Sequence, residues 1–329
     1  MEKKKKRKSL FELIYRTRRD GKGVEKEPLG PPNVVNFFKL YKRQFGNVVK
    51  INLLMLFGNF PLFFGFFALT GYLNHTSPAP ASYLFGPLYG AMTASPDAVS
   101  PSTMMLFGIH GVQAEASVMS TATYVFFALT ALVLFTFGFV NVGTSYLLRN
   151  IVRGEPIFFW QDFWYAIKRN RRQALIYGIL DCVIMLLLGY NITLSYFNLG
   201  NMMVNIVFFG NLLLIFVYFM MRFYVYIMMV TFELSIFKLF KNAFIFALLG
   251  IKRNALAVTG IGLSLAVTYS LLIVFQPIGI LIPFTLLFGT GALMGAYAAY
   301  PKIKELMIDP YYKSDRPGSE PIAADGENA

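Results

Sequence analysis

The sequence predicts an all-α membrane protein with about six transmembrane helices, and three observations support this class. Of its 329 residues, 56% are hydrophobic and only 14% are charged, whereas a soluble domain carries about 25% charged residues. The apolar residues form runs of about twenty, which is the length that a helix needs to cross the hydrocarbon layer of a bilayer. The Lys and Arg residues gather in every second connection between these runs.

Six runs are long enough to span a membrane. The fourth could tilt or extend beyond the bilayer, and only Gln276 and Pro277 separate the last two, which predicts a tight hairpin. The runs are continuously apolar rather than alternating, so they predict helices and not the strands of a β-barrel. The predicted spans are residues 51–73, 124–148, 173–197, 202–230, 254–275 and 278–300.

The basic residues predict the orientation of these spans, because Lys and Arg accumulate on the cytoplasmic side of inserted proteins. With the N-terminus inside, fifteen precede the first span, six lie between residues 149 and 172, four follow the fourth span and four follow the sixth. The remaining one, Arg222, lies within the fourth span, and the outer segments contain none. We therefore expect both ends of the chain in the cytoplasm.

This pattern divides the chain into three parts. Residues 1–33 form a basic cytoplasmic tail, residues 34–300 a six-helix membrane domain with a large outer loop at residues 74–123, and residues 301–329 a partly disordered cytoplasmic tail. The outer loop contains two apolar pieces, at residues 83–92 and 104–112, that are too short to cross. They could lie on the outer surface, re-enter the membrane or cover a cavity.

The net charge of +13 indicates a lipid partner. Because the charge follows one membrane face, we expect it to attract anionic lipids, at about 1 kcal/mol per basic residue near the surface. The basic run at residues 3–8 also fits a nuclear signal or a nucleic-acid-binding arm, but no nucleic-acid partner is expected.

Three segments share a pattern: an aromatic or apolar stretch, then Lys-Arg, then Gln or Asn. They are residues 37–44, 163–170 and 246–254. Each precedes two predicted spans, which suggests three units, each an interfacial helix followed by a transmembrane hairpin. Aromatic rings would enter the head-group boundary while Lys and Arg stay in water. Alternatively, any inner connection collects aromatic and basic residues.

The chain resembles the YesL-like family of uncharacterised bacterial integral membrane proteins in three stretches, at residues 37–61, 153–180 and 232–254. The stretches contain Lys-Arg-Gln-Phe-Gly at residues 42–46, Phe-Trp-Tyr-Ala-Ile-Lys-Arg-Asn at 163–170 and Lys-Asn-Ala at 241–243. The resemblance implies the bacterial cytoplasmic membrane and an association with carbohydrate uptake or utilisation. It supplies no catalytic residues, and the outer loop and the basic N-terminus have no counterpart in it.

Asp181 and Arg222 are the sharpest candidates for a site. Each lies about eight residues from the inner edge of its span, which at 1.5 Å per residue places both about 12 Å deep. Because their spans are consecutive and antiparallel, we expect an ion pair, since buried charges in lipid are expensive unless paired. The pair could couple transport to a proton or a polar substrate, it could brace two helices, or Arg222 could snorkel to the inner surface.

Asn59 and Asn141 fall at a similar depth in the first two spans and could complete an inner polar cluster. Intramembrane Asn also serves helix packing, so both interpretations stay open. Gly289, Gly291 and Gly295 in the sixth span form a small-residue stripe, which favours close helix packing within or between subunits.

The sequence contains no hydrolase, kinase or dinucleotide-binding signature, so we expect no enzyme, no catalytic residues, no metal and no cofactor. We expect a protein that assists or performs transport of a solute, which the resemblance suggests is a carbohydrate, with transporter subunits as candidate partners. The alternative is a non-transporting scaffold or regulator that acts through its basic cytoplasmic face. The oligomeric state stays open.

Overall fold

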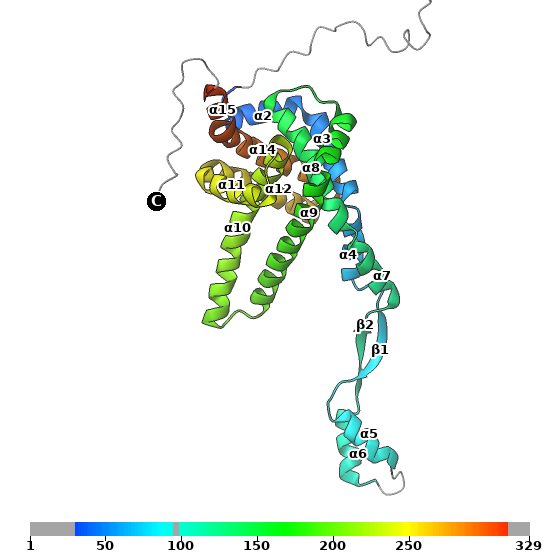
Figure 1. Ribbon diagram of the computed structural model, residues 1–329. Helices are drawn as coiled ribbons and strands as arrows, with labels where there is room; N and C mark the ends of the chain where they lie inside the picture. Colours follow the sequence, from blue (N-terminus) through cyan, green and yellow to red (C-terminus); the bar gives the residue numbers. More distant parts are fainter. Residues whose placement is uncertain (1–29, 95–98, 315–329) are drawn as a thin grey trace, which may run out of the picture.

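The protein is a helical membrane protein, as a computed structural model that describes residues 30–94 and 99–314 shows (Figure 1). Five helical segments are long and apolar enough to span a membrane, and a bent pair of helices makes a sixth. The predicted fold class is therefore confirmed. The predictions for the basic run at residues 3–8 and for the disordered end at residues 315–329 lie outside the described residues.

Most elements follow the predicted order of interfacial helices and spans. The helices are α2 (Val34–Arg43), α3 (Phe45–Gly58), α4 (Pro61–Leu69), α5 (Phe85–Ala94), α6 (Pro101–His110), α7 (Thr121–Thr130), α8 (Val133–Arg153), α9 (Phe159–Phe197), α10 (Met202–Thr231), α11 (Ile236–Leu249), α12 (Ile251–Val274), α13 (Gln276–Ile282), α14 (Phe288–Ile303) and α15 (Asp309–Ser314). Two strands, β1 (His75–Pro80) and β2 (Gln113–Val118), lie in the outer loop.

The first span is broken rather than straight. Helices α3 and α4 meet at a bend of 64°, where Asn59 ends α3 and Pro61 begins α4. Proline removes a backbone donor and clashes with the preceding turn, so it is tolerated in the first turn of a helix but not in its interior. The predicted span at residues 51–73 therefore consists of two helices that meet at a bend.

Other spans differ from the prediction at their ends. Helix α10 begins at the predicted Met202, whereas α9 begins at Phe159, fourteen residues before the predicted start, and has a kink at Asn170. The sixth span passes through π-helical turns at Pro283–Leu287 and Lys304–Ile308. The helical chain continues to Ser314, so the part of the predicted tail at residues 301–314 is helical.

The three-unit pattern has a common backbone geometry. Each interfacial segment ends at a residue with φ near −100° and ψ near +15°: Gln44 between α2 and α3, Asn170 within α9, and Gly250 between α11 and α12. The third break comes four residues before Asn254, the Asn of the sequence pattern. A long apolar helix starts after each break, so each unit is a helical segment followed by a hairpin.

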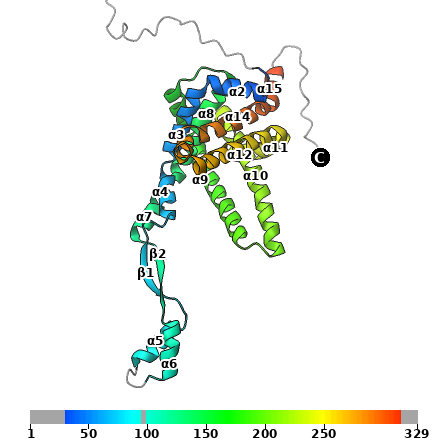
Figure 2. The same ribbon diagram turned by 180° about the vertical axis from the view of Figure 1, so that it is seen from behind.

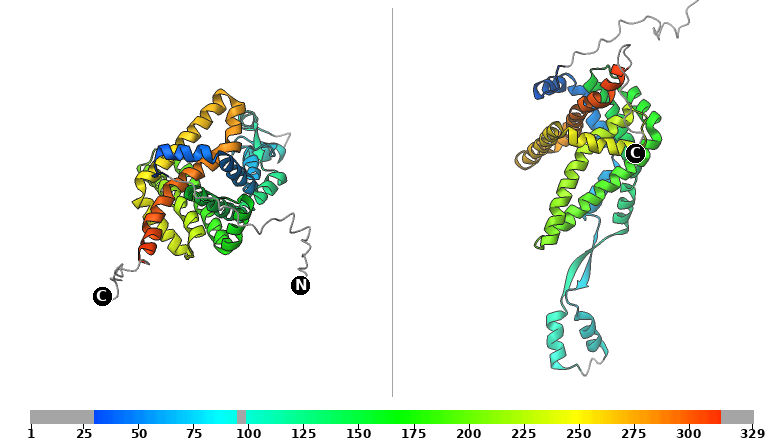
Figure 3. Two further views of the ribbon diagram at one scale, coloured as in Figure 1. Left: turned by 90° about the horizontal axis from the view of Figure 1, so that it is seen from above. Right: turned by 60° about the vertical axis from the view of Figure 1, so that its left-hand side comes forward.

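The three hairpins extend from one common helical body. The α4–α7 and α9–α10 pairs project from one side of it (Figures 1 and 2), and seen from above the gold-to-orange α12–α14 pair extends in another direction (Figure 3, left). Within the body, the second helices of the three hairpins, α8, α10 and α14, all contact one another. Each also contacts the first helix of another unit: α8 with α9, α14 with α3, and α10 with α12. The arrangement is therefore cyclic.

Two of these junctions use glycine in the same way. A Cβ on Gly138 of α8 would meet the backbone of Ala174 and Gly178 in α9, and a Cβ on Gly289 of α14 would meet Val48 and Asn52 in α3. In both first helices, the contacted residues lie four and eight positions after the break residue. Glycine is needed here because the two helix backbones approach too closely for a side chain.

The third junction, between α10 and α12, has no such contact. The one glycine of α10, Gly210, has nothing within 4 Å of a built Cβ. Instead, the Tyr224 hydroxyl donates a 2.9 Å hydrogen bond to Oδ1 of Asn254, four residues after the third break. The Asn254 side chain also donates to the Ala247 carbonyl of α11. A tyrosine side chain therefore bridges α10 and α12, whereas the helices of the other two junctions touch through their backbones.

The outer loop forms an arm. Strands β1 and β2 pair as an antiparallel ribbon in which His75 lies opposite Val118 and Pro80 opposite Gln113. Helices α5 and α6 form the far tip of this arm (Figures 1 and 2). Both apolar pieces of the loop therefore overlap helices at the tip and do not cover the helical body.

Candidate functional site

Asp181 of α9 is held by three groups from α10. Its side chain is completely buried. The Nε atom of Arg222 lies 2.9 Å from Oδ1 and 3.0 Å from Oδ2. The Tyr218 hydroxyl donates to Oδ1 at 2.8 Å, and the Tyr226 hydroxyl donates to Oδ2 at 2.6 Å. The ion pair expected from the depths of Asp181 and Arg222 is present, and two tyrosines complete it.

The spacing on α10 explains how three donors converge. Tyr218, Arg222 and Tyr226 are separated by four residues each, which puts them on one face of a helix. This face meets α9, whose Gly178 lies three residues before Asp181 and allows α8 to pack closely on the other side. A carboxylate that accepts several hydrogen bonds and pairs with an arginine can stay charged away from water.

A cavity of about 310 Å³ lies among the second helices of the three hairpins, next to this cluster. Helices α8, α10 and α14 all contribute to its wall, and α12 contributes Ile261 and Leu265. It borders the α10–α12 junction, where no backbone contact closes the gap. The cavity wall therefore includes residues from both helices of this junction.

The cavity wall is apolar with a polar sector. Phe219, Phe223 and Phe288 supply aromatic surface. The polar groups come from α8 and α10 and are Asn141, Thr144, Ser145, Arg222 and Tyr226. A concave apolar site with a few convergent polar groups is the usual form of a small-molecule site.

Arg222 connects the ion pair to the cavity. Its Nε atom is engaged by Asp181, and its guanidinium carbon lies 5.4 Å from the centre of the Phe137 ring. No hydrogen bond joins its two terminal nitrogens to another residue within the described ranges. An arginine held in this way can donate to a carboxylate, phosphate or hydroxyl group in the cavity without giving up its buried partner.

The structure separates the two predicted asparagines. Asn141 lines the cavity and donates to the Phe137 carbonyl of its own helix. Asn59 is not part of the cavity wall: it donates to the Met55 carbonyl at the end of α3, and its Oδ1 atom is buried without a partner in the described part of the chain. The predicted inner cluster therefore contains Asp181, Arg222 and Asn141 but not Asn59.

Sequence reasoning missed Tyr218, Tyr226 and Thr144. The four-residue spacing of the tyrosines around Arg222 is a signal that could have identified them, since it places two hydroxyl groups beside the one charge in the span. Thr144 has no comparable signal, because its hydroxyl group donates to the Val140 carbonyl as in many apolar helices.

Within residues 30–94 and 99–314, no three His, Cys, Asp or Glu side chains come together as a group that could hold a metal ion.

Comparisons of the chain with protein families, with curated proteins and with solved structures find no match. The resemblance to the YesL-like family therefore stays a prediction. The function has to be inferred from the cavity and the residues that line it.

Proposed function

We propose that this chain assists or performs the transport of a small polar solute across the bacterial cytoplasmic membrane, through the cavity beside Arg222. The observation that carries this proposal is the guanidinium group of Arg222, which is fixed by Asp181 through one nitrogen and borders the cavity. Buried ionisable residues in membrane spans usually face a bundle interior and mark substrate or ion pathways.

The wall of the cavity supports a small solute with hydrogen-bonding groups. Its volume of about 310 Å³ is at the lower limit of the usual range for ligand sites, about 300–1,000 Å³. Side-chain amide, hydroxyl and guanidinium groups lie on one part of the wall and aromatic rings on another. A monosaccharide combines hydroxyl groups with apolar C–H faces, which fits such a wall and the carbohydrate class that the family resemblance implies.

A flux assay on the purified full-length protein in sealed vesicles tests the proposal. We expect labelled monosaccharides or small organic acids to cross faster than in protein-free vesicles, and Arg222→Gln to abolish the difference. Lys238→Gln on α11 is the matched control, since it removes a positive charge outside the cavity. A measurable flux that is equal in the wild type and in Arg222→Gln, with both proteins folded, would contradict the proposal.

A transporter subunit gives a different result in the same assay. If the chain assists a separate permease or ATPase, the pure protein carries no flux, and the solute binds to it in a manner that depends on Arg222. Isothermal titration with the same solutes distinguishes this arrangement from the absence of a solute site.

The second candidate is a scaffold or regulator that acts through its basic face. The observation that favours it is the aromatic surface of the interfacial helices, where Phe38, Trp160, Trp164 and Phe237 are all exposed. Such a protein would neither transport nor bind solutes, and it would co-purify with a partner whose association is lost on neutralising Lys238 and Lys241.

A further inference from the structure

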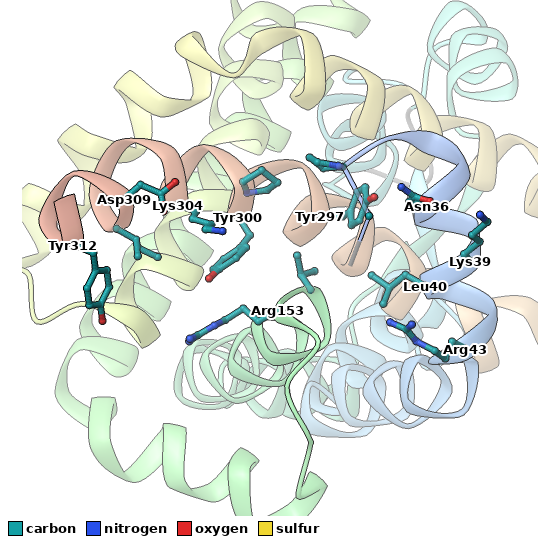
Figure 4. A pocket seen from close by; sticks show the side chains of 15 residues that line it. Asn36, Lys39, Leu40, Arg43, Arg153, Tyr297, Tyr300, Lys304, Asp309 and Tyr312 are labelled. Atoms are coloured by element: carbon teal, nitrogen blue, oxygen red, sulfur yellow. The ribbon is translucent and has the colours of Figure 1, made fainter. Parts of the chain in front are cut away.

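A basic pocket of about 600 Å³ lies where α2, the end of α8 and the end of the sixth span meet (Figure 4). Lys39 comes from α2, Arg153 from the last turn of α8 and Lys304 from the π-helical turn that follows α14. Figure 4 shows these side chains arranged around the opening, with Arg43 on the α2 side.

The pocket keeps a positive balance. Asp309 is the one acidic residue in its lining, against the four cations Lys39, Arg43, Arg153 and Lys304. Arg153 also pairs with Glu155 at 2.8 Å, so part of its charge is compensated. Tyr300 adds a hydroxyl group, and the Asn36 amide, which donates to the Pro31 carbonyl, has a second N–H to donate. Several cations from separate elements, together with neutral donors, fit a phosphate-bearing group.

An apolar groove of about 490 Å³ lies on the other side of α2, against α12 and α14. Val34 and Phe38 of α2 and Leu256 and Leu263 of α12 line it, and all four side chains are exposed. Exposed apolar side chains on a membrane protein face lipid, so an acyl chain can enter this groove from the bilayer.

The basic pocket and the apolar groove adjoin each other. Pro32 and Tyr297 line both. The Tyr297 hydroxyl donates to the Asn33 carbonyl at 3.0 Å, and its ring packs edge-on against Phe37 with the centroids 5.3 Å apart. These contacts fix the start of α2 between the two spaces. A molecule that fills both must therefore be anionic at one end and apolar at the other.

We propose that one anionic phospholipid binds here, with its phosphate headgroup in the basic pocket and one acyl chain in the apolar groove. A soluble phosphate compound would use the pocket alone and leave the groove without a role. The site is separate from the cavity beside Arg222, since no residue lines both. It would anchor α2, the first interfacial helix, to a lipid of one class.

Native mass spectrometry of the detergent-purified full chain tests this proposal. The probes are phosphatidylglycerol, phosphatidylcholine with the same acyl chains, and glycerol 3-phosphate. We expect phosphatidylglycerol to bind in preference to phosphatidylcholine. Lys39→Gln and Lys304→Gln should each weaken phosphatidylglycerol binding about fivefold. Lys42→Gln is the matched control, because Lys42 lies on the same helix but does not line the pocket.

A second pair of variants tests the groove. Leu263→Trp places a larger side chain in it, while Val267→Trp makes a similar change one turn further along α12, outside the groove. We expect only Leu263→Trp to weaken phosphatidylglycerol binding, and neither to change glycerol 3-phosphate binding.

Two results would overturn the proposal. If glycerol 3-phosphate displaces phosphatidylglycerol at equal concentration and Leu263→Trp has no effect, the occupant is a soluble phosphate compound. If Lys42→Gln weakens binding as much as Lys39→Gln does, the lipid is attracted by the whole basic face and not by this pocket.

Discussion

Gly138 of α8 lies against Gly178 of α9, and a Cβ built on Gly138 would come within 2.9 Å of the Gly178 Cα atom. Gly289 of α14 makes the equivalent approach to Val48 and Asn52 of α3. These two contacts join the hairpins at corresponding positions. The third junction, between α10 and α12, is bridged by Tyr224 instead.

Gly138→Ala and Gly289→Ala should each destabilise the protein by about 1–3 kcal/mol, because the added methyl group meets backbone atoms that cannot rotate away. The measurement is unfolding in mixed micelles, followed by the fluorescence of Trp160 and Trp164. Gly262→Ala is the control, since a Cβ there meets nothing within 4 Å; it should be neutral or stabilising because Ala favours helix. Equal losses of stability in all three variants would argue against the close junctions.

Asp181→Asn and Arg222→Gln should each destabilise the protein by about 3–5 kcal/mol, because each leaves the other charge buried without its partner. The exchange Asp181→Arg with Arg222→Asp should recover part of this loss. Recovery should be incomplete, since Tyr218 and Tyr226 are placed to donate to a carboxylate on α9. The fraction of folded protein after extraction measures the effect, and no recovery in the double variant would count against the pairing.

Tyr226→Phe should cost about 1 kcal/mol, in the range measured for hydrogen bonds within membranes. Tyr177→Phe provides the comparison, because Tyr177 is equally deep and packs on Tyr226 with ring centroids 5.1 Å apart. Its hydroxyl group lies beside that of Tyr218 and makes no bond to Asp181, so removing it should cost less than removing the Tyr226 hydroxyl group. Thermal unfolding of the two variants measures both effects. A larger loss of stability in Tyr177→Phe than in Tyr226→Phe would contradict the prediction.

Arg149→Gln should destabilise the protein by about 1.5–3 kcal/mol, the usual contribution of a hydrogen bond to a charged group. Arg149 is buried, donates to the Val230 carbonyl at 2.8 Å and lies over the Tyr146 ring. It thus satisfies the end of α10, where helix carbonyls lack partners and cations are favoured. Arg172→Gln, an exposed change of the same type, should have little effect in the same unfolding measurement.

Labelling of single cysteines tests the orientation. In a Cys182→Ser background, Gly86→Cys on the arm should react with a membrane-impermeant maleimide added to intact cells. Lys241→Cys on α11 should react only after the membrane is permeabilised. Labelling of both positions in intact cells would place the arm and the basic face on the same side and overturn the predicted topology.

Much of the fold could be predicted from the sequence, because apolar length and basic flanks are properties of single segments. The start of α10 at Met202 and the position of the interfacial segments follow from these properties alone. The bend beside Pro61 had a visible signal in the proline itself. The third break could not be placed, since Gly250 and Asn254 are both plausible ends for an interfacial helix and only packing against Tyr224 decides between them.

The Asp181–Arg222 pair could be predicted because each is a rare charge within its span and their depths match. The cavity could not, because its wall combines residues from α8, α10, α12 and α14, and that requires knowing which helices meet. Asn59 illustrates the limit of the depth argument. Like Asn141, it donates to the carbonyl four residues earlier on its own helix, but α3 does not place it in the cavity wall.

The ribbon of the outer arm has an edge with few backbone donors. Pro78 and Pro80 of β1 lie two residues apart, so their backbone nitrogens face the same side of the strand. Ala81 follows directly and faces the other side, where it donates its N–H to the Val112 carbonyl. The proline nitrogens therefore point away from β2 and offer no N–H to an approaching strand. Strands from adjacent copies of the protein cannot readily pair with β1 through backbone hydrogen bonds. The arm can therefore stand apart from the membrane without promoting aggregation.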